Sequence, residues 1–131
     1  MSEPAARRGL GNAGEALAAR WLEARGYRIV ARNWRCQWGE LDLIASQGST
    51  LVFVEVKTRR GTQLGAPEEA ITARKRAHLC DSAAAYLAAL DDTDVLHQPR
   101  DYRIDVVAVQ LSPAGKLIEI RHHPDAVGED A

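Results

Sequence analysis

The fold of this chain is decided by residues 39–57, which read GELDLIASQGSTLVFVEVK. Two runs rich in Val, Leu and Ile, namely Leu41–Ala45 and Leu51–Lys57, stand on either side of a turn-forming segment, Ser46–Ser49. This pattern predicts a β-hairpin. Acidic residues lie within both runs, although a strand buried in an ordinary hydrophobic core would carry none.

The acids of this hairpin are predicted to share one face. Because side chains alternate along a strand, Glu55 and Lys57 lie on the same face as Phe53. With the hairpin tip at residues 47–48, Asp42 pairs with Phe53 and lies diagonal to Glu55, about 7–8 Å away between backbones. That separation lets both carboxylates reach one cation. A register slip of one residue would move Asp42 to the other face.

Two carboxylates that converge on one point repel each other, and a bound cation is the usual remedy. Oxygen ligands of this kind suit Mg²⁺ or Mn²⁺. Lys57, one pleat beyond Glu55, is placed to orient a water molecule or to stabilise charge on a phosphate. The set predicts metal-assisted phosphodiester hydrolysis. The alternative is an ordinary ion pair between Glu55 and Lys57 at a strand end.

The remaining segments give the element order α-β-β-β-α-β-β. The elements expected outside the hairpin are a helix over Ala13–Arg25, a strand over Tyr27–Ala31, a loop over Asn33–Gly39, a helix over Pro67–Leu90, and strands over Tyr102–Gln110 and Leu117–His122. Two strands joined by a helix of this length lie parallel, so the hairpin makes the sheet mixed. We expect one α/β domain of two or three layers over residues 1–122, followed by a frayed tail over 123–131.

The composition excludes several classes of protein. The 131 residues suit one domain, and 46% hydrophobic with 27% charged residues excludes wholesale disorder. Cys36 and Cys80 form no Cys-x-x-Cys pair, which excludes a zinc ribbon and a disulfide scaffold. No segment approaches the roughly 18 apolar residues of a membrane span, and no signal-peptide core is present. We therefore expect a soluble, cytoplasmic protein with no membrane partner.

Charge is unevenly distributed along the chain. The net charge is −1, but residues 1–90 carry 13 Lys and Arg against 9 Asp and Glu, whereas residues 91–131 carry 4 against 9. Basic clusters of this kind either contact phosphates or form solvated surface. The candidate nucleic-acid contacts are Arg35, Arg59, Arg60 and Lys75. In the acidic half, Asp105 shares a strand face with Arg103, which predicts a structural ion pair.

Two further residues carry open alternatives. Glu15 lies at the border of the buried face of the first helix, from which its side chain can reach a site at the edge of the sheet. It also stands three residues after Asn12, as in a capping box that needs no metal. Lys75 lies on the apolar stripe of the second helix, between Ile71 and Leu79. It either reaches the site or extends its ammonium group to water, and we expect the second.

The hairpin resembles the D-(x)n-E-x-K core of the restriction-endonuclease-like superfamily. The matching positions are Asp42, Glu55 and Lys57. More closely, the chain resembles the YraN family of small uncharacterised bacterial proteins, over nearly its whole length to about residue 122. The segments that carry this resemblance are Gly11–Glu15 (GNAGE), Arg32–Asn33, Lys75 and Arg103–Val109. The resemblance implies a restriction-endonuclease-like fold akin to Holliday-junction resolvases, a nucleic-acid ligand, and Glu15 as a third metal ligand.

Three functions are consistent with the sequence. The first is an endonuclease dependent on Mg²⁺ or Mn²⁺ that acts on DNA, including branched or structured DNA. Its metal ligands are Asp42, Glu55 and Glu15, and Lys57 contacts water or phosphate. The second is a nucleic-acid-binding module without efficient catalysis, and the third is a small structural or interaction protein. The intact acidic set favours the first, and the weak overall basic charge favours the third. Two-fold symmetric substrates would suit a homodimer.

Overall fold

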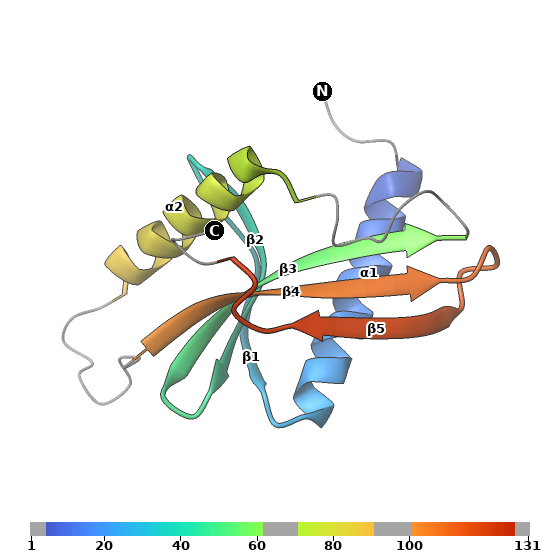
Figure 1. Ribbon diagram of the computed structural model, residues 1–131, viewed down its shortest axis with the longest axis horizontal. Coiled ribbons are helices and arrows are strands. Elements are labelled where there is room, and N and C mark those ends of the chain that lie inside the picture. The colour runs from blue at the N-terminus through green and yellow to red at the C-terminus, as the bar shows by residue number, and fades with distance from the viewer. Residues whose placement is uncertain (1–4, 62–70, 91–100, 128–131) are drawn as a thin grey trace.

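A five-stranded mixed sheet with one helix on each face forms the body of the protein (Figure 1). The computed structural model describes residues 5–61, 71–90 and 101–127, with side chains from residue 11 onward. Its elements are α1 (Ala5–Ala24), β1 (Arg28–Cys36), β2 (Gly39–Gln47), β3 (Thr50–Arg60), α2 (Ala73–Ala88), β4 (Asp101–Leu111) and β5 (Leu117–His123). Neither of the described helices has the length and apolar character needed to cross a membrane.

The strands lie in the order in which they occur in the chain, β1 to β5. β3 and β4 run parallel, and the other neighbouring pairs are antiparallel. The parallel pair follows from the crossover through α2, as the sequence predicted. The element order and the mixed sheet agree with the restriction-endonuclease-like α/β fold expected from the resemblance.

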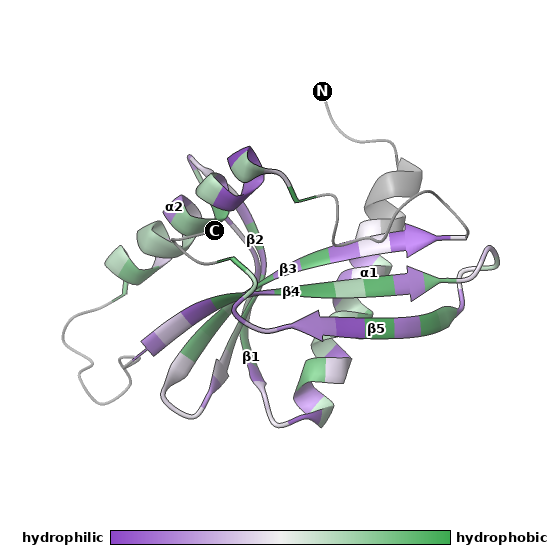
Figure 2. Ribbon diagram, viewed as in Figure 1, coloured by the Kyte–Doolittle hydropathy of each residue, from purple (hydrophilic) through white to green (hydrophobic). Residues whose placement is uncertain are grey.

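Two hydrophobic clusters form the core, one on each face of the sheet. Side chains alternate in direction along the strands, which separates the two clusters. Because both faces are covered, the central strands carry hydrophobic stretches, as the green parts of β4 in Figure 2 show. On β3, Val52 and Val54 pack under α1 with Leu22, whereas Phe53 packs under α2 with Leu79. The architecture therefore has three layers, and the two faces of the hairpin are those that the sequence predicted.

The first strand is longer than expected. Residues 33–36, predicted as a loop, continue β1 and pair with β2 down to Cys36 and Gly39. Neighbouring β2 supplies the hydrogen bonds of this polar segment, so tertiary pairing overrides its weak strand propensity.

Both helices begin elsewhere than predicted. α1 starts at Ala5, eight residues earlier than expected. α2 starts at Ala73, after an N-cap at Thr72 whose hydroxyl accepts the Lys75 N–H at 3.1 Å. The predicted start at Pro67 lies outside the described residues.

The hairpin register differs from the prediction by two residues. Gln47 pairs with Thr50 and Ile44 with Phe53, so the turn is formed by Gly48 and Ser49. Gly48 has a φ of 60°, which glycine adopts without steric cost. Because the shift is an even number of residues, the side chains of the paired part of β2, from Leu43 to Gln47, keep their predicted faces.

The predicted tail is packed as far as it is described. Val127 is 3% exposed, and its N–H bonds to the Ile104 carbonyl at 3.3 Å. Asp105, fully buried, accepts hydrogen bonds from Arg103 (3.0 Å) and from the Asp125 backbone N–H (2.8 Å). The ion pair with Arg103 is the one predicted. These contacts hold residues 123–127 against the sheet instead of leaving them frayed.

A glycine sets how closely α1 approaches the sheet. A Cβ atom added to Gly14 would lie 2.9 Å from Thr58 Cβ on β3, closer than real Cβ atoms come. We expect Gly14→Ala to lower the free energy of unfolding by about 1–3 kcal/mol, because overpacking must push α1 away from β3. Urea unfolding followed by circular dichroism measures this change.

Gly11, one turn earlier in the same helix, is the matched control. A Cβ atom there meets nothing within 4 Å. Gly11→Ala should stabilise the protein by roughly 0.5–1 kcal/mol through helix propensity alone. Equal effects of the two substitutions would contradict close packing at Gly14.

Candidate metal centre

The candidate site lies where β2 and β3 separate. Their pairing is regular from Gln47 and Thr50 as far as Leu43 and Val54. Beyond that point, the Val56 N–H donates to Asp42 Oδ2 at 2.8 Å. In a continued ladder, a backbone carbonyl of β2 would accept the hydrogen bond from this N–H. The Asp42 carboxyl accepts it instead, and it lies in the opening between the two strands.

β2 turns about its own axis at Asp42. Leu41 and Leu43 would share a face in a regular strand, yet Leu41 packs in the cluster under α2 and Leu43 in the cluster under α1. On β1, Asn33 lies between the partners of these two leucines and has a left-handed φ of 51°. Asn is one of the few residues that adopt this conformation readily. The distortion directs Asp42 into the opening.

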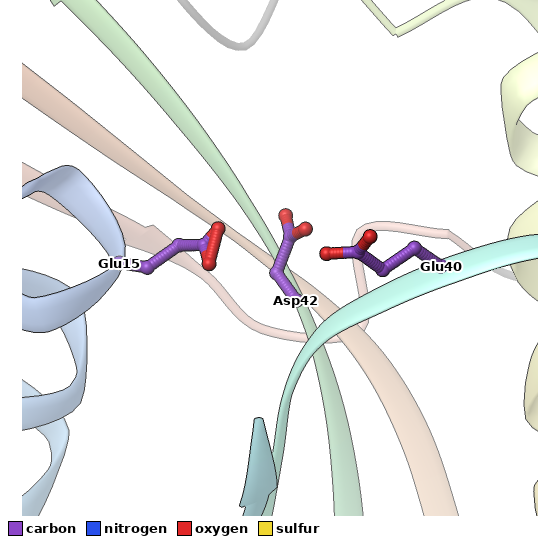
Figure 3. A group of neighbouring side chains, drawn as sticks. All are labelled: Glu15, Glu40 and Asp42. Atoms are coloured by element: carbon purple, nitrogen blue, oxygen red, sulfur yellow. The ribbon is translucent and has the colours of Figure 1, made fainter. Parts of the chain in front are cut away.

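Two more acids point toward Asp42, from opposite sides. Glu15 comes from α1 and Glu40 from β2, as Figure 3 shows. One carboxylate oxygen from each of the three acids lies within 4.8 Å of the other two. Asn33 Nδ2 donates to Glu15 Oε1 (2.7 Å) and to Glu40 Oε1 (2.8 Å). The side-chain amide of Asn33 on β1 therefore links Glu15 of α1 to Glu40 of β2 at the site.

Glu55 forms the buried part of the site. It is 4% exposed, and within the described chain its Oε2 receives no hydrogen bond. The Lys75 ammonium on α2 lies 3.4 Å from that oxygen. Lys75 thus reaches the site, and the expectation that it extends to water was wrong. Because Lys75 lies on the apolar stripe of α2, its side chain points toward the sheet, where the Glu55 carboxylate is its countercharge.

Burial and mutual repulsion perturb the acids. Burial, the charge of Glu55 and a hydrogen bond with Glu55 together raise the pKa of the Asp42 carboxyl to about 9. The hydrogen bond from the Val56 N–H acts in the opposite direction. Burial also raises the pKa of Glu15, reinforced by Glu40 and Glu55 and opposed by the hydrogen bond from Asn33. Without a cation, Asp42 is protonated at neutral pH.

The donor set fits a hard divalent cation. Glu40 has both oxygens engaged, one by Asn33 and the other by Arg35 Nε at 3.0 Å. The other three acids each keep capacity for a ligand bond, and the buried, unbonded Oε2 of Glu55 is the clearest case. Carboxylate oxygens are the ligands that Mg²⁺ and Mn²⁺ prefer. Asp42 and Glu15 belong to the group whose oxygens lie within 4.8 Å of one another, whereas Glu55 stands outside it and acts on the pKa of both. Asp42, Glu55 and Glu15 could therefore hold the ion, with Glu40 as a support.

The structure removes one alternative for Glu15. Because α1 begins at Ala5, Asn12 lies inside the helix and cannot cap it, so the capping-box interpretation was wrong. Glu15 instead faces the opening in the sheet.

The four remaining predicted site residues are basic, and they differ in how they are placed relative to the acids. Lys57 follows Glu55 on β3, and its ammonium makes no ion pair with any part of the chain that the structure describes. Arg35 lies at the margin of the site through Glu40, with its side chain 79% exposed. Arg59 continues β3 beyond Lys57. Arg60 contacts the β4–β5 turn instead, since a Cβ atom at Gly115 would lie 3.0 Å from its guanidinium.

Sequence reasoning missed Asn33 and Glu40 as members of the site. Glu40 precedes Asp42 by two residues, a spacing that places both acids near one another on a strand. Asn33 was assigned to a loop, and its left-handed φ inside a strand leaves no signal in a single sequence. Its role is visible only once β1 pairs with β2.

Comparison with known proteins agrees with the motifs. A family model described as "Uncharacterised protein family UPF0102" matches residues 14–109. A UPF0102 protein from Roseiflexus castenholzii is 48% identical over 120 residues, covering 92% of this chain and 94% of the relative. One from Symbiobacterium thermophilum is 52% identical, covering 84% and 89%. Another, from Chloroflexus aurantiacus, is 43% identical and covers 97% and 99%. The chain therefore belongs to UPF0102, the uncharacterised YraN-like bacterial family that its motifs indicated.

Proposed function

We propose that this protein is an endonuclease that hydrolyses phosphodiester bonds of DNA with Mg²⁺ or Mn²⁺ held by Asp42, Glu55 and Glu15. The observation that carries the proposal is the buried Oε2 of Glu55, which has no hydrogen bond. Glu55 contacts Asp42, and Asp42 is grouped with Glu15 and Glu40, one oxygen of each lying within 4.8 Å of the others. A purely structural network would satisfy such an atom. A divalent cation satisfies several carboxylates at once.

The residues of the chain have distinct tasks in this proposal. When bound, the cation polarises the phosphate and makes water a better nucleophile. The Val56 N–H and Asn33 hold the carboxylates of Asp42 and Glu15 in place before substrate arrives. Lys57 donates a hydrogen bond to a phosphate oxygen and stabilises its growing negative charge. Water oxygen bonds to phosphorus and releases one proton to solvent, the bond from phosphorus to the leaving sugar oxygen breaks, and that oxygen takes up a proton from solvent.

The nucleic-acid part of the proposal is supported by charge. Residues 1–90 carry a net charge of +4, and Arg35 presents a largely exposed guanidinium beside the acids. Fluorescence anisotropy should show DNA affinity falling about tenfold or more between roughly 50 and 200 mM salt, because phosphate contacts release counterions. The double variant Arg59→Ala, Arg60→Ala should weaken binding to all sequences alike. Arg20→Ala, an exposed change on α1, should leave it nearly unchanged.

The decisive experiment is cleavage of linear, nicked and branched DNAs by purified protein with Mg²⁺, Mn²⁺ or EDTA. Cleavage that needs the cation supports the proposal and identifies the preferred substrate. Salt-dependent binding without cleavage of any substrate would instead identify a nucleic-acid-binding module. Absence of both binding and cleavage would leave a structural or interaction role.

A further inference from the structure

Lys75 is held against the acidic site by the start of α2. Its backbone N–H bonds to the hydroxyl of Thr72, the N-cap, so the lysine occupies the first turn of the helix. From there the side chain reaches Glu55, with Nζ 3.4 Å from Oε2. The lysine side chain is 37% exposed and that of the glutamate 5%. One partner is therefore buried, and the other keeps a path to solvent.

The contact is an ion pair without a hydrogen bond. Oε2 of Glu55 is buried and is not hydrogen-bonded by Lys75 or by any other described residue. A buried carboxylate needs both a countercharge and donors, and here Lys75 supplies only the charge. The oxygen that Lys75 neutralises belongs to a carboxylate that the proposed function gives to the divalent cation, which would approach to about 2.0–2.1 Å. An ammonium 3.4 Å from this oxygen and a divalent cation bound to the same oxygen would repel each other.

We infer that Lys75 is the exchangeable counter-ion of Glu55. Its ammonium neutralises Glu55 while no divalent cation is bound, and cation binding displaces it toward solvent along its exposed stem. The inference rests on the cation site of the proposed function. In it, the Lys75 ammonium occupies the place beside Glu55 until a divalent cation binds. Because the ammonium and the cation compete for one oxygen, Lys75 lowers the affinity of the protein for the cation.

Lys57 provides a matched comparison. It is also a lysine, it follows Glu55 by two residues on the same strand, and it makes no ion pair with Glu55 or any other described residue. Removing either lysine changes the net charge near the acids by the same amount. Only removal of Lys75 also removes a group that must leave for the cation to bind.

The test is titration of the full chain with Mn²⁺ alone, without DNA, by calorimetry at pH 8. We expect Lys75→Met to tighten Mn²⁺ binding about tenfold, and Lys57→Met to change it by less than about threefold. Lys75→Arg keeps the charge and should stay within about threefold of the original protein. Circular dichroism of each variant in EDTA verifies that it is folded.

The outcomes separate this inference from the proposed nuclease activity. Equal Mn²⁺ affinities for the Lys75→Met and Lys57→Met variants would overturn the counter-ion role and leave the cation site intact. Failure of all the folded proteins to bind Mn²⁺ would overturn both. Tighter binding by Lys75→Met in a protein that cuts no DNA would support the counter-ion role and contradict the nuclease.

Discussion

Glu55→Gln should lower the rate of cation-dependent DNA cleavage by about three orders of magnitude or more. The substitution keeps the shape of the side chain but removes the charge from the most buried carboxylate of the site, which is 4% exposed. A lost cation contribution of several kcal/mol corresponds to this factor, since each 1.36 kcal/mol is tenfold in rate. Single-turnover cleavage with saturating Mn²⁺ measures the effect.

Three other variants sharpen this experiment. Asp42→Asn should be as damaging as Glu55→Gln, whereas Lys57→Ala should slow cleavage and leave Mn²⁺ binding intact, because Lys57 is not a ligand. Glu119→Gln, a change of the same kind at an exposed position of β5, is the control and should retain full activity. Cleavage that survives both Asp42→Asn and Glu55→Gln would have to come from another site or from a contaminant.

Mn²⁺ affinity should rise steeply with pH. The pKa of Asp42 is raised to about 9, so below that pH the proton must leave before Asp42 can bind the ion. Between about pH 7 and pH 9 the affinity should therefore increase by up to tenfold per pH unit, with about one proton released per ion bound. Calorimetry in buffers of different ionisation enthalpy measures both quantities.

Asp42→Asn again serves as the control, because it removes the proton in question. Any Mn²⁺ binding that this variant retains should depend much less on pH over the same range. A flat pH profile for the original protein would show that Asp42 is not a ligand or is already ionised.

Features governed by periodicity could be predicted from the sequence. The faces of Glu55 and Lys57 follow from alternation along one strand, and they remain correct after the register changed by two residues. The parallel pairing of β3 and β4 follows from the length of the crossover between them. These features depend on geometry that every strand or crossover shares.

Features that depend on a particular neighbour could not be predicted in the same way. The polar end of β1 is a strand because β2 lies beside it. The role of the left-handed Asn33 depends on its hydrogen bonds to both Glu15 and Glu40. Lys75 is directed to Glu55 by the packing of α2 on the sheet. The contacts of Asn33 and Lys75 join residues 7 to 20 positions apart in the chain, which local pattern does not encode.

The buried Asp105 cluster has a consequence for engineering. Its charge is compensated locally by Arg103, by the Asp125 N–H and by His122, whose Nε2 lies 2.7 Å from Asp105 Oδ2. None of these groups is among the charges that shift the pKa of Asp42 or Glu15, and none of the site acids shifts that of Asp105. The partners of Asp105 thus form an ionic cluster distinct from the acids of the candidate metal centre. Asp105 pairs with Val54, next to Glu55 in the β3–β4 ladder, yet it has its own set of partners. Stabilising substitutions among those partners should escape the usual trade-off between stability and activity, which makes them the place to begin a thermostable variant.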